Sequence, residues 1–251
     1  MKAAVINFSG NVGKSTVARH MLLPRIEDAE FVCVESINAD EGDGNTVRGR
    51  QFGALSEQLL LIDSAVIDVG SSNVEDFVRL MRQYEGSHED VDLFVVPTVK
   101  ESKQIRDTIA TIQALAAMGV PANRVRVVFN KVETDETLED AFYPLLAYHD
   151  DTQAFALRPK AAVHFSELYE RLRTHDVTIA ELLADPTDHK AELRQAKTPE
   201  ERSAAAARIS MRRLAGSAQA NLDAAFAAIT AEQSALLDEI PADIVVSRTY
   251  E

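Results

Sequence analysis

Five short runs of apolar, largely β-branched residues mark the first 150 residues, and each is followed by a stretch with helical spacing. The runs lie at 3–6, 31–34, 65–67, 93–96 and 125–129. Near-continuous apolar runs of this length are typical of strands buried on both faces of a parallel sheet. The helical stretches between them, such as 101–119, would form the right-handed crossovers. The pattern predicts a doubly wound, mostly parallel α/β sheet.

Beyond residue 160 the apolar spacing becomes helical. A further short run at 154–157 suggests one more strand, residues 164–184 predict one or two helices, and Asp185-Pro186-Thr187-Asp188 is a break. Thr198 followed by Pro199 predicts the start of a long alanine-rich helix that reaches about residue 230. We therefore expect a nucleotide-binding core over 1–160, a helical part over 161–240 and a tail over 241–251.

The segment 36–53 is the longest connection without apolar periodicity. Connections of this length inside compact α/β domains are usually functional or mobile loops. A solvated excursion with no function is the alternative.

Composition narrows the class of protein. The 251 residues, 46% hydrophobic and 26% charged, suit one globular domain with an appendage. A net charge of -14 argues against nucleic-acid binding by the whole surface, although a local basic patch remains possible. A single cysteine, Cys33, excludes an intramolecular disulfide and a cysteine-based metal cage. Without an apolar leader or a run of roughly 18 apolar residues, we expect a cytoplasmic protein with no membrane span.

The strongest chemical signal lies between the first predicted strand and the following helix. It reads Asn7-Phe8-Ser9-Gly10-Asn11-Val12-Gly13-Lys14-Ser15-Thr16. A turn of small residues that enters a helix directs several backbone N–H groups at one point, where the helix dipole also favours an anion. Lys14 can reach the β- and γ-phosphates of a nucleotide, and the Ser15 hydroxyl can bind Mg²⁺. Residues Ser9 to Thr16 are therefore expected to bind phosphates.

Two readings of this loop compete. The full pattern G-x-x-x-x-G-K-[ST] has a glycine where this sequence has Phe8. A plain tight turn at Gly10 and Gly13 is therefore the alternative, although strand, Gly-Lys-Ser and helix follow one another in the right order.

The loop resembles the deviant Walker A loop of the ParA/MinD ATPases, which typically reads N-x-K-G-G-x-G-K-T-T. Ser9 stands where that family has a second, signature lysine, and Asn11 stands where it has the middle glycine. Within the superfamily, the opening residues look most like the StbB-type plasmid stability and conjugation proteins. The superfamily resemblance covers about residues 1–160, and the StbB likeness mainly the first 25.

This resemblance implies an ATP-driven switch in plasmid stability, segregation or conjugation that positions DNA or protein cargo. It also implies a plasmid partition or conjugation protein as partner, and a nucleotide-dependent homodimer in which the signature lysine contacts the partner's phosphates. Ser9 cannot supply that charge. Arg48 or Arg50, in the long connection, are the candidate replacements because of their charge and position.

Carboxylates follow two of the apolar runs. By the resemblance, Asp68 is a Walker B carboxylate that supports the Mg²⁺ shell through water; capping of the helix that begins near Val74 is the alternative. Glu35 ends the second run, near where the family has a catalytic aspartate, and Asn38 and Asp40 compete for that role. Such a carboxylate can orient the attacking water, whereas a solvated loop of like charges needs no function. The catalytic candidates are Lys14, Glu35, Asp40 and Asp68.

Asn130-Lys131-Val132-Glu133 follows the fifth run. In the resembled ATPases an asparagine here reads the adenine edge, since an amide carries both a donor and an acceptor. The N-K-x-D motif of GTPases is also close, but Glu133 is one methylene longer than its aspartate, so we favour ATP over GTP. A strand-end turn residue is the alternative. Arg158 lies where the family has a further base-stacking loop. Lys131 and Arg158 complete the predicted nucleotide contacts.

The long C-terminal helix is locally basic although the chain is acidic. No acid occurs between residues 202 and 220. The basic residues there are Arg202, Arg208, Arg212 and Arg213. Side chains one turn apart share a helix face that can run along phosphates, so DNA binding is one interpretation. Ion pairs with Glu200, Glu201 or a neighbouring helix are the other.

Two further functions stay open. A carboxylate-activating ligase of the dethiobiotin-synthetase type shares the fold and the loop, and small carboxylates should then stimulate phosphate release. The ParA/MinD ATPases have a D-x-D motif near the position of Glu35, and this sequence has no such motif there. A nucleotide-binding scaffold without turnover would explain this absence and Ser9, and would bind nucleotide without hydrolysing it.

Overall fold

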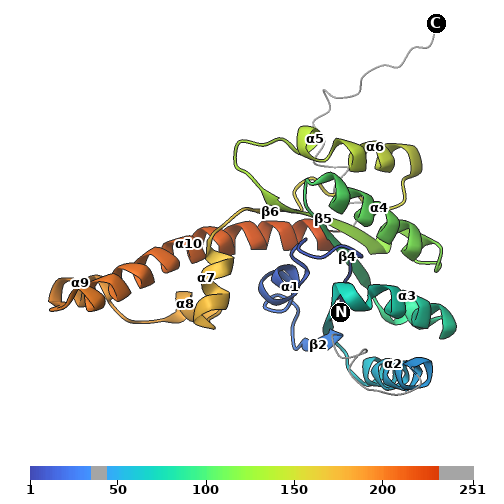
Figure 1. Cartoon of the computed structure of the whole chain (residues 1–251), viewed down its shortest axis with the longest axis horizontal. Helices are drawn as coiled ribbons and strands as arrows, with labels where there is room; N and C mark the ends of the chain where they lie inside the picture. Colours follow the sequence, from blue (N-terminus) through green and yellow to red (C-terminus); the bar gives the residue numbers. More distant parts are fainter. Residues whose placement is uncertain (35–43, 232–251) are drawn as a thin grey trace, which may run out of the picture.

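A computed structural model describes residues 1–34 and 44–231 of the chain (Figure 1). Its centre is a six-stranded sheet in the order β2-β3-β1-β4-β5-β6, and every neighbouring pair is parallel. The strands are β1 (Lys2–Val5), β2 (Glu30–Val34), β3 (Ala65–Val69), β4 (Leu93–Thr98), β5 (Val125–Val132) and β6 (Ala162–His164). The predicted fold class and the five predicted strands are confirmed.

The sheet separates two hydrophobic cores. Ala4 and Ile6 face one core, whereas Ala3 and Val5 face the other, because successive side chains of a strand point to opposite faces. Every residue of β3 and β4 is buried. Helices on both faces therefore explain why these strands read as continuous apolar runs.

One face is covered by helices that precede β6 in the chain. They are α2 (Gly44–Leu61), α3 (Val74–Gln83), α4 (Ser102–Ala116), α5 (Leu138–Ala141) and α6 (Tyr143–Thr152). The second core combines the helix after β1 with the C-terminal helices. These are α1 (Lys14–Thr16) with its π-helical continuation Val17–Leu22, α7 (Leu168–His175), α8 (Ile179–Ala184) and α10 (Pro199–Thr230).

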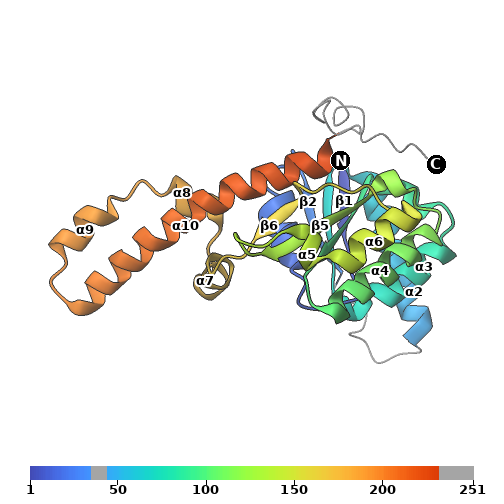
Figure 2. The ribbon, with the colours of Figure 1, turned by 90° about the horizontal axis from the view of Figure 1, so that it is seen from above.

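The C-terminal helix α10 is the longest element. Thr198 Oγ1 accepts a hydrogen bond from Glu201 N, and the Glu201 carboxylate accepts one from Thr198 N, each at 3.2 Å. Pro199 occupies the first turn, where its missing N–H has no cost. The C-terminal end of α10 packs against one face of the sheet, and its other end projects away with α9 (His189–Gln195) (Figure 2). The predicted helix from 199 to about 230 is confirmed.

Two expectations need correction. Helix α2 begins at Gly44, so the loop predicted over 36–53 is wrong from residue 44 onward, and 36–43 lies outside the described residues. Phe52 and Leu59, seven residues apart, are buried in the first core and anchor this helix. The additional strand is β6, not 154–157, where Ala156 alone bridges β5. The chain turns at 158–161, around Pro159, before it pairs again.

Candidate functional site

The small-residue loop lies at the carboxyl edge of the sheet, between β1 and α1. Gly13 has φ +85° and Asn11 has φ +60°, so the chain turns sharply before the helix begins at Lys14. A Cβ atom on Gly13 would overlap Nδ2 of Asn130, whereas one on Gly10 would lie 3.6 Å from Ser71 Oγ, an ordinary contact. Glycine is therefore required at position 13 for two reasons, backbone conformation and space.

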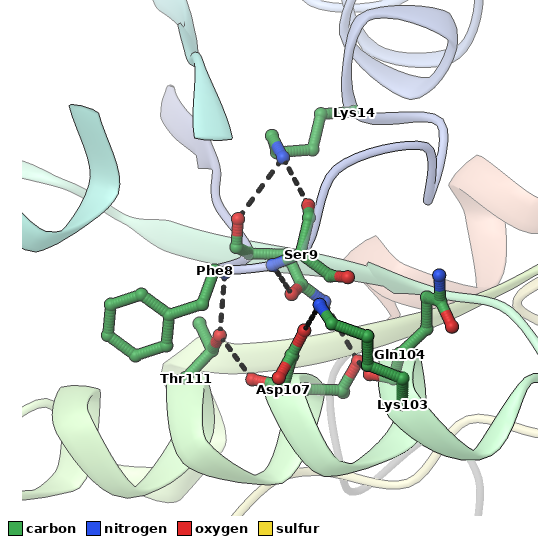
Figure 3. A network of polar contacts seen from close by, with 9 residues as sticks. Phe8, Ser9, Lys14, Lys103, Gln104, Asp107 and Thr111 are labelled. Atoms are coloured by element: carbon green, nitrogen blue, oxygen red, sulfur yellow. Dashed lines mark hydrogen bonds and ion pairs between the residues drawn. The ribbon is translucent and has the colours of Figure 1, made fainter. Parts of the chain in front are cut away.

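Helix α4 supports the first part of the loop (Figure 3). Asn7 Nδ2 donates to Thr108 Oγ1 at 2.8 Å and to the Pro97 carbonyl at 2.9 Å. The backbone N–H of Phe8 donates to Thr111 Oγ1 at 3.0 Å. All three side chains, those of Asn7, Thr108 and Thr111, are buried. The Thr-x-x-Thr spacing that places both hydroxyls on one face of α4 was missed in the sequence.

The side chain of Phe8 points away from the side of the loop that would hold a ligand. Its ring points away from Lys14 in Figure 3 and packs against the first core. It also lines a cleft of about 550 Å³ together with residues of α3 and α4. A side chain at the position of the first Walker A glycine therefore does not enter the space above the loop.

The backbone N–H groups of residues 10–13 are the candidate ligand donors of the loop, although Val12 is itself fully buried. Within the described residues, none of these four donates a hydrogen bond to the protein. Gly10, Asn11 and Ser15 are exposed. Donors that converge beside a helix N-terminus form an anion-binding arrangement.

Lys14 is buried beneath this loop. Its Nζ donates to the Ser9 carbonyl at 2.6 Å and to the Asn7 carbonyl at 3.1 Å. Burial lowers the pKa of Lys14 from 10.5 to about 8, and the attraction of Asp68 opposes that shift. Asp68 is buried in β3, opposite Val5 of β1. The structure thus brings Lys14 and Asp68 together. The capping position of α3 is Asn73, not Asp68.

Asn130 and Lys131 hold the other side of the loop. Asn130 Nδ2 donates to the Val12 carbonyl at 2.8 Å, and its Oδ1 accepts from Lys131 N at 2.9 Å. Lys131 Nζ donates to the Asn11 carbonyl at 3.2 Å. The amide of Asn130 therefore positions the loop, and base recognition by these residues stays a prediction.

Arg158, the third predicted base contact, is bonded to other parts of the chain than the loop between β1 and α1. It is buried, and its Nη1 donates to the Leu157 carbonyl at 3.0 Å. Burial, followed by the neighbouring charge of Arg158, lowers the pKa of Arg126 to about 10. Arg126 in turn donates to the carbonyl of Ile229, near the end of α10. No hydrogen bond joins Arg158 to the loop within the described residues, and its base-stacking role stays a prediction.

A charged pair that the sequence did not indicate lies beside Ser9. Lys103 Nζ is 2.8 Å from Asp107 Oδ2 on α4. The hydrogen bond from Lys103 lowers the pKa of Asp107, and burial opposes that shift. Ser9 itself is buried. A cationic side chain thus lies near the position of the missing lysine, but on another element.

Several predicted residues lie outside the described structure. They are Glu35, Asn38 and Asp40, together with the side chains of Arg48 and Arg50. Val34 is the last described residue before Glu35, and its carbonyl accepts a hydrogen bond of 2.9 Å from Asn73 Nδ2. The turn that follows Asp68 is thereby tied to the end of β2.

The basic patch on α10 is only partly available. Arg212 donates to the carbonyls of Asp185 at 2.6 Å and Leu183 at 3.2 Å, so it fastens the end of α8 to α10. Arg212 thus contacts a neighbouring helix through backbone carbonyls, and no ion pair of Arg212 occurs among the described residues. Arg202, Arg208 and Arg213 are exposed, and Arg212 is half-buried. DNA binding by this patch stays a prediction.

No cluster of three or more His, Cys, Asp or Glu side chains suited to a metal ion occurs in residues 1–34 and 44–231. A Mg²⁺ ion held by a hydroxyl, phosphate oxygens and water needs no such cluster. Over the same residues, no helix has the length and apolarity needed to cross a membrane.

No family model matches the sequence, and no curated protein is significantly similar to it. Solved structures with a similar course of the chain include apo McdA from Cyanothece, with 13% identity and a TM-score of 0.49 over 72% of this chain and 92% of that chain. They also include the ATP complex of a Cyanothece McdA variant, with 13% identity and a TM-score of 0.44 over 72% and 89%.

Proposed function

We propose that the chain binds ATP at the loop between β1 and α1 and acts as an ATP-hydrolysing switch of the ParA/MinD type. One observation carries this proposal: among the described residues, backbone N–H groups of the loop that donate to no protein acceptor lie beside a buried lysine at the start of a helix. Polyphosphates suit this arrangement, because several fixed donors and one ammonium group meet a concentrated negative charge.

The residues of the loop also fit a nucleotide with Mg²⁺. Ser15 is exposed at the start of α1, and Asp68 lies behind Lys14, so these two would support the ion. When bound, Mg²⁺ would neutralise part of the phosphate charge. Lys14 exchanges its two carbonyl acceptors for phosphate oxygens. Bound phosphate then favours the charged ammonium group, against the burial that lowers its pKa.

The same contacts support a switch. Gly10 adjoins Ser71, and Asn73 reaches the Val34 carbonyl. A nucleotide at Gly10 therefore acts on the turn after Asp68, and through it on the end of β2. Ordering of such segments is a common way to report nucleotide state. The finer function that we propose is plasmid stability, segregation or conjugation, with a partition or conjugation protein as partner and a nucleotide-dependent homodimer.

Equilibrium titration with ATP and GTP in the presence of Mg²⁺ tests nucleotide binding. We expect ATP to bind, and Lys14→Ala to weaken it at least tenfold because a charge-assisted phosphate contact is lost. Lys100→Ala is the matched control: this lysine is exposed, pairs with Glu136 at 2.8 Å and, among the described residues, forms no hydrogen bond with the loop. Equal ATP affinity for Lys14→Ala and the unaltered chain would contradict the site.

Phosphate release separates the switch from its alternatives. Slow ATP hydrolysis that a carboxylate substrate does not accelerate supports the switch. Stimulation by small carboxylates would favour the ligase, and tight ATP binding without phosphate release would favour the scaffold. Light scattering or sedimentation with and without ATP tests the homodimer, which should form only with nucleotide.

A further inference from the structure

Recognition of the nucleoside is the part of the site that remains unassigned. Both hydrogen-bonding atoms of the Asn130 amide are engaged by the loop and its neighbour, and Arg158 is buried beside Arg126. A nucleotide whose phosphates lie at the loop must place its sugar and base somewhere beyond it. A cavity that adjoins the loop is the expected site of the sugar and base.

Such a cleft lies between the helix after β1 and the C-terminal helices. It has a volume of about 990 Å³, and Ser15 and Thr16 form part of its wall. Its opposite wall consists of residues of α7 and the start of α8. The cleft therefore begins where the phosphate-binding residues end, and it is large enough for a nucleoside.

The charges of the cleft suit an uncharged ligand with many hydrogen-bonding groups. Two basic residues, Arg19 and Arg173, line it together with three acids: Glu170, Asp176 and Glu181. Burial, and to a smaller extent Arg19, lowers the pKa of His20, so His20 is neutral at pH 7 and adds no positive charge. A polyanion such as DNA or an acidic peptide would meet these carboxylates. A ribose and a base present hydroxyls, amines and ring nitrogens instead.

Some of the lining groups already have partners. The Glu181 carboxylate accepts hydrogen bonds from Thr178 N and Oγ1, at 2.7 and 2.9 Å. The guanidinium carbon of Arg19 lies 4.3 Å from the centre of the Phe31 ring. These groups shape the wall.

Helix α7 carries polar side chains that form no ion pair within the described residues. Within the described residues, the side chains of Glu170 and Arg173 form no ion pair. Tyr169 lies one helical turn before Arg173, and its ring centre is 5.8 Å from that of His20. Burial raises the pKa of Tyr169 to about 12, so its hydroxyl keeps its proton. A planar ring, a planar guanidinium and a carboxylate that can accept ribose hydroxyls thus meet on one helix.

We propose that this cleft holds the sugar and base of the nucleotide, and that Tyr169, Glu170 and Arg173 of α7 contact them. This inference rests on the proposed nucleotide binding and adds recognition by the C-terminal helices, outside the predicted core over 1–160. A ligand that joins the loop to α7 links the two sides of the cleft.

Comparison of two ligands tests it. ATP has phosphates and a nucleoside, whereas tripolyphosphate has the phosphates alone. In Mg²⁺ titrations we expect Arg173→Ala and Glu170→Gln each to weaken ATP at least fivefold and to leave tripolyphosphate within twofold. Arg171→Ala is the matched control, because this half-buried arginine of α7 pairs with Glu167 at 3.0 Å and does not line the cleft.

Each outcome decides the question. ATP affinities within twofold for both cleft variants, or an equal loss for ATP and tripolyphosphate, would overturn the inference and leave the proposed nucleotide binding intact. Failure of the unaltered chain to bind either ligand would overturn the proposed function itself. Thermal unfolding of every variant establishes that it folds, and Glu170→Gln preserves the size of the side chain should Arg173→Ala be unstable.

Discussion

Gly13→Ala tests the local geometry of the loop most directly. The added methyl group meets two obstacles: the backbone at residue 13 has φ +85°, and its Cβ would overlap Nδ2 of Asn130 and lie 3.3 Å from its Cγ. The Asn130 side chain is held by Val12 and Lys131 and cannot move without losing both hydrogen bonds. The substitution therefore forces either the loop or Asn130 out of place.

The expected cost can be estimated from these contacts. A left-handed conformation costs a non-glycine residue about 1–2 kcal/mol. Displacement of Asn130 removes two hydrogen bonds of about 0.5–1.5 kcal/mol each. We expect Gly13→Ala to lower the free energy of unfolding by about 2–5 kcal/mol, and to weaken ATP at least tenfold where the protein still folds. Gly10→Ala should cost far less, since its Cβ makes an ordinary contact with Ser71.

A double-mutant cycle measured by urea unfolding separates the two obstacles. In the Asn130→Ala background the overlap is gone, so Gly13→Ala should cost only the backbone strain of about 1–2 kcal/mol. The difference between the costs of Gly13→Ala in the two backgrounds is the energy of the steric overlap with Asn130. If Gly13→Ala costs the same in both backgrounds, or less than Gly10→Ala, the arrangement of the loop against Asn130 is wrong.

Three further measurements follow from pKa values and helix capping. Because burial lowers the pKa of Lys14 to about 8, fluorescence titrations should show ATP affinity falling as the pH rises above 8, approaching tenfold per pH unit, and a constant affinity from pH 7 to 9.5 would contradict this. His189 donates to Glu192 and Asp185, which raises its pKa; the stability it adds is complete below pH 6.5 and disappears as the pH rises through the raised pKa. The urea midpoint should lose this pH dependence in His189→Ala, and an unchanged pH profile would count against the contact. Thr198→Ala should lower the free energy of unfolding by about 1 kcal/mol, measured by urea, and no change would mean that the start of α10 contributes nothing.

Much of the fold could be predicted because the strands are buried on both faces. Residues 93–96 of β4, for example, form an unbroken apolar run, and the signals at Thr198 and Pro199 mark the start of α10. Helix α2 escaped detection because its first turns carry glycine and polar residues, and its apolar anchors begin only at Phe52. The strand β6 has three residues, too few for a periodic pattern to emerge.

The site could be predicted only where one segment carries it. The loop and Lys14 are adjacent in sequence, so the sequence alone predicts that they bind phosphate. The supports come from distant elements: Thr108 lies 101 positions from Asn7, and Asn130 lies 118 positions from Val12. The role of Asn130 was uncertain for a physical reason, since an amide can hold a carbonyl as readily as it can read a base.

Lys14 links the loop to helix α4, because the ammonium group and α4 both bind the segment from Asn7 to Ser9 and share Asn7. Its two acceptors are the carbonyls of Asn7 and Ser9, while α4 binds the Asn7 amide and the Phe8 N–H. A phosphate that takes over the ammonium group leaves both carbonyls without that donor, and the loop must then adjust against α4. Adjustment of the loop therefore changes its contacts with α4, the helix that carries Asp107 and its partner Lys103. This places α4, as well as the turn after Asp68, among the elements whose position depends on the occupied loop.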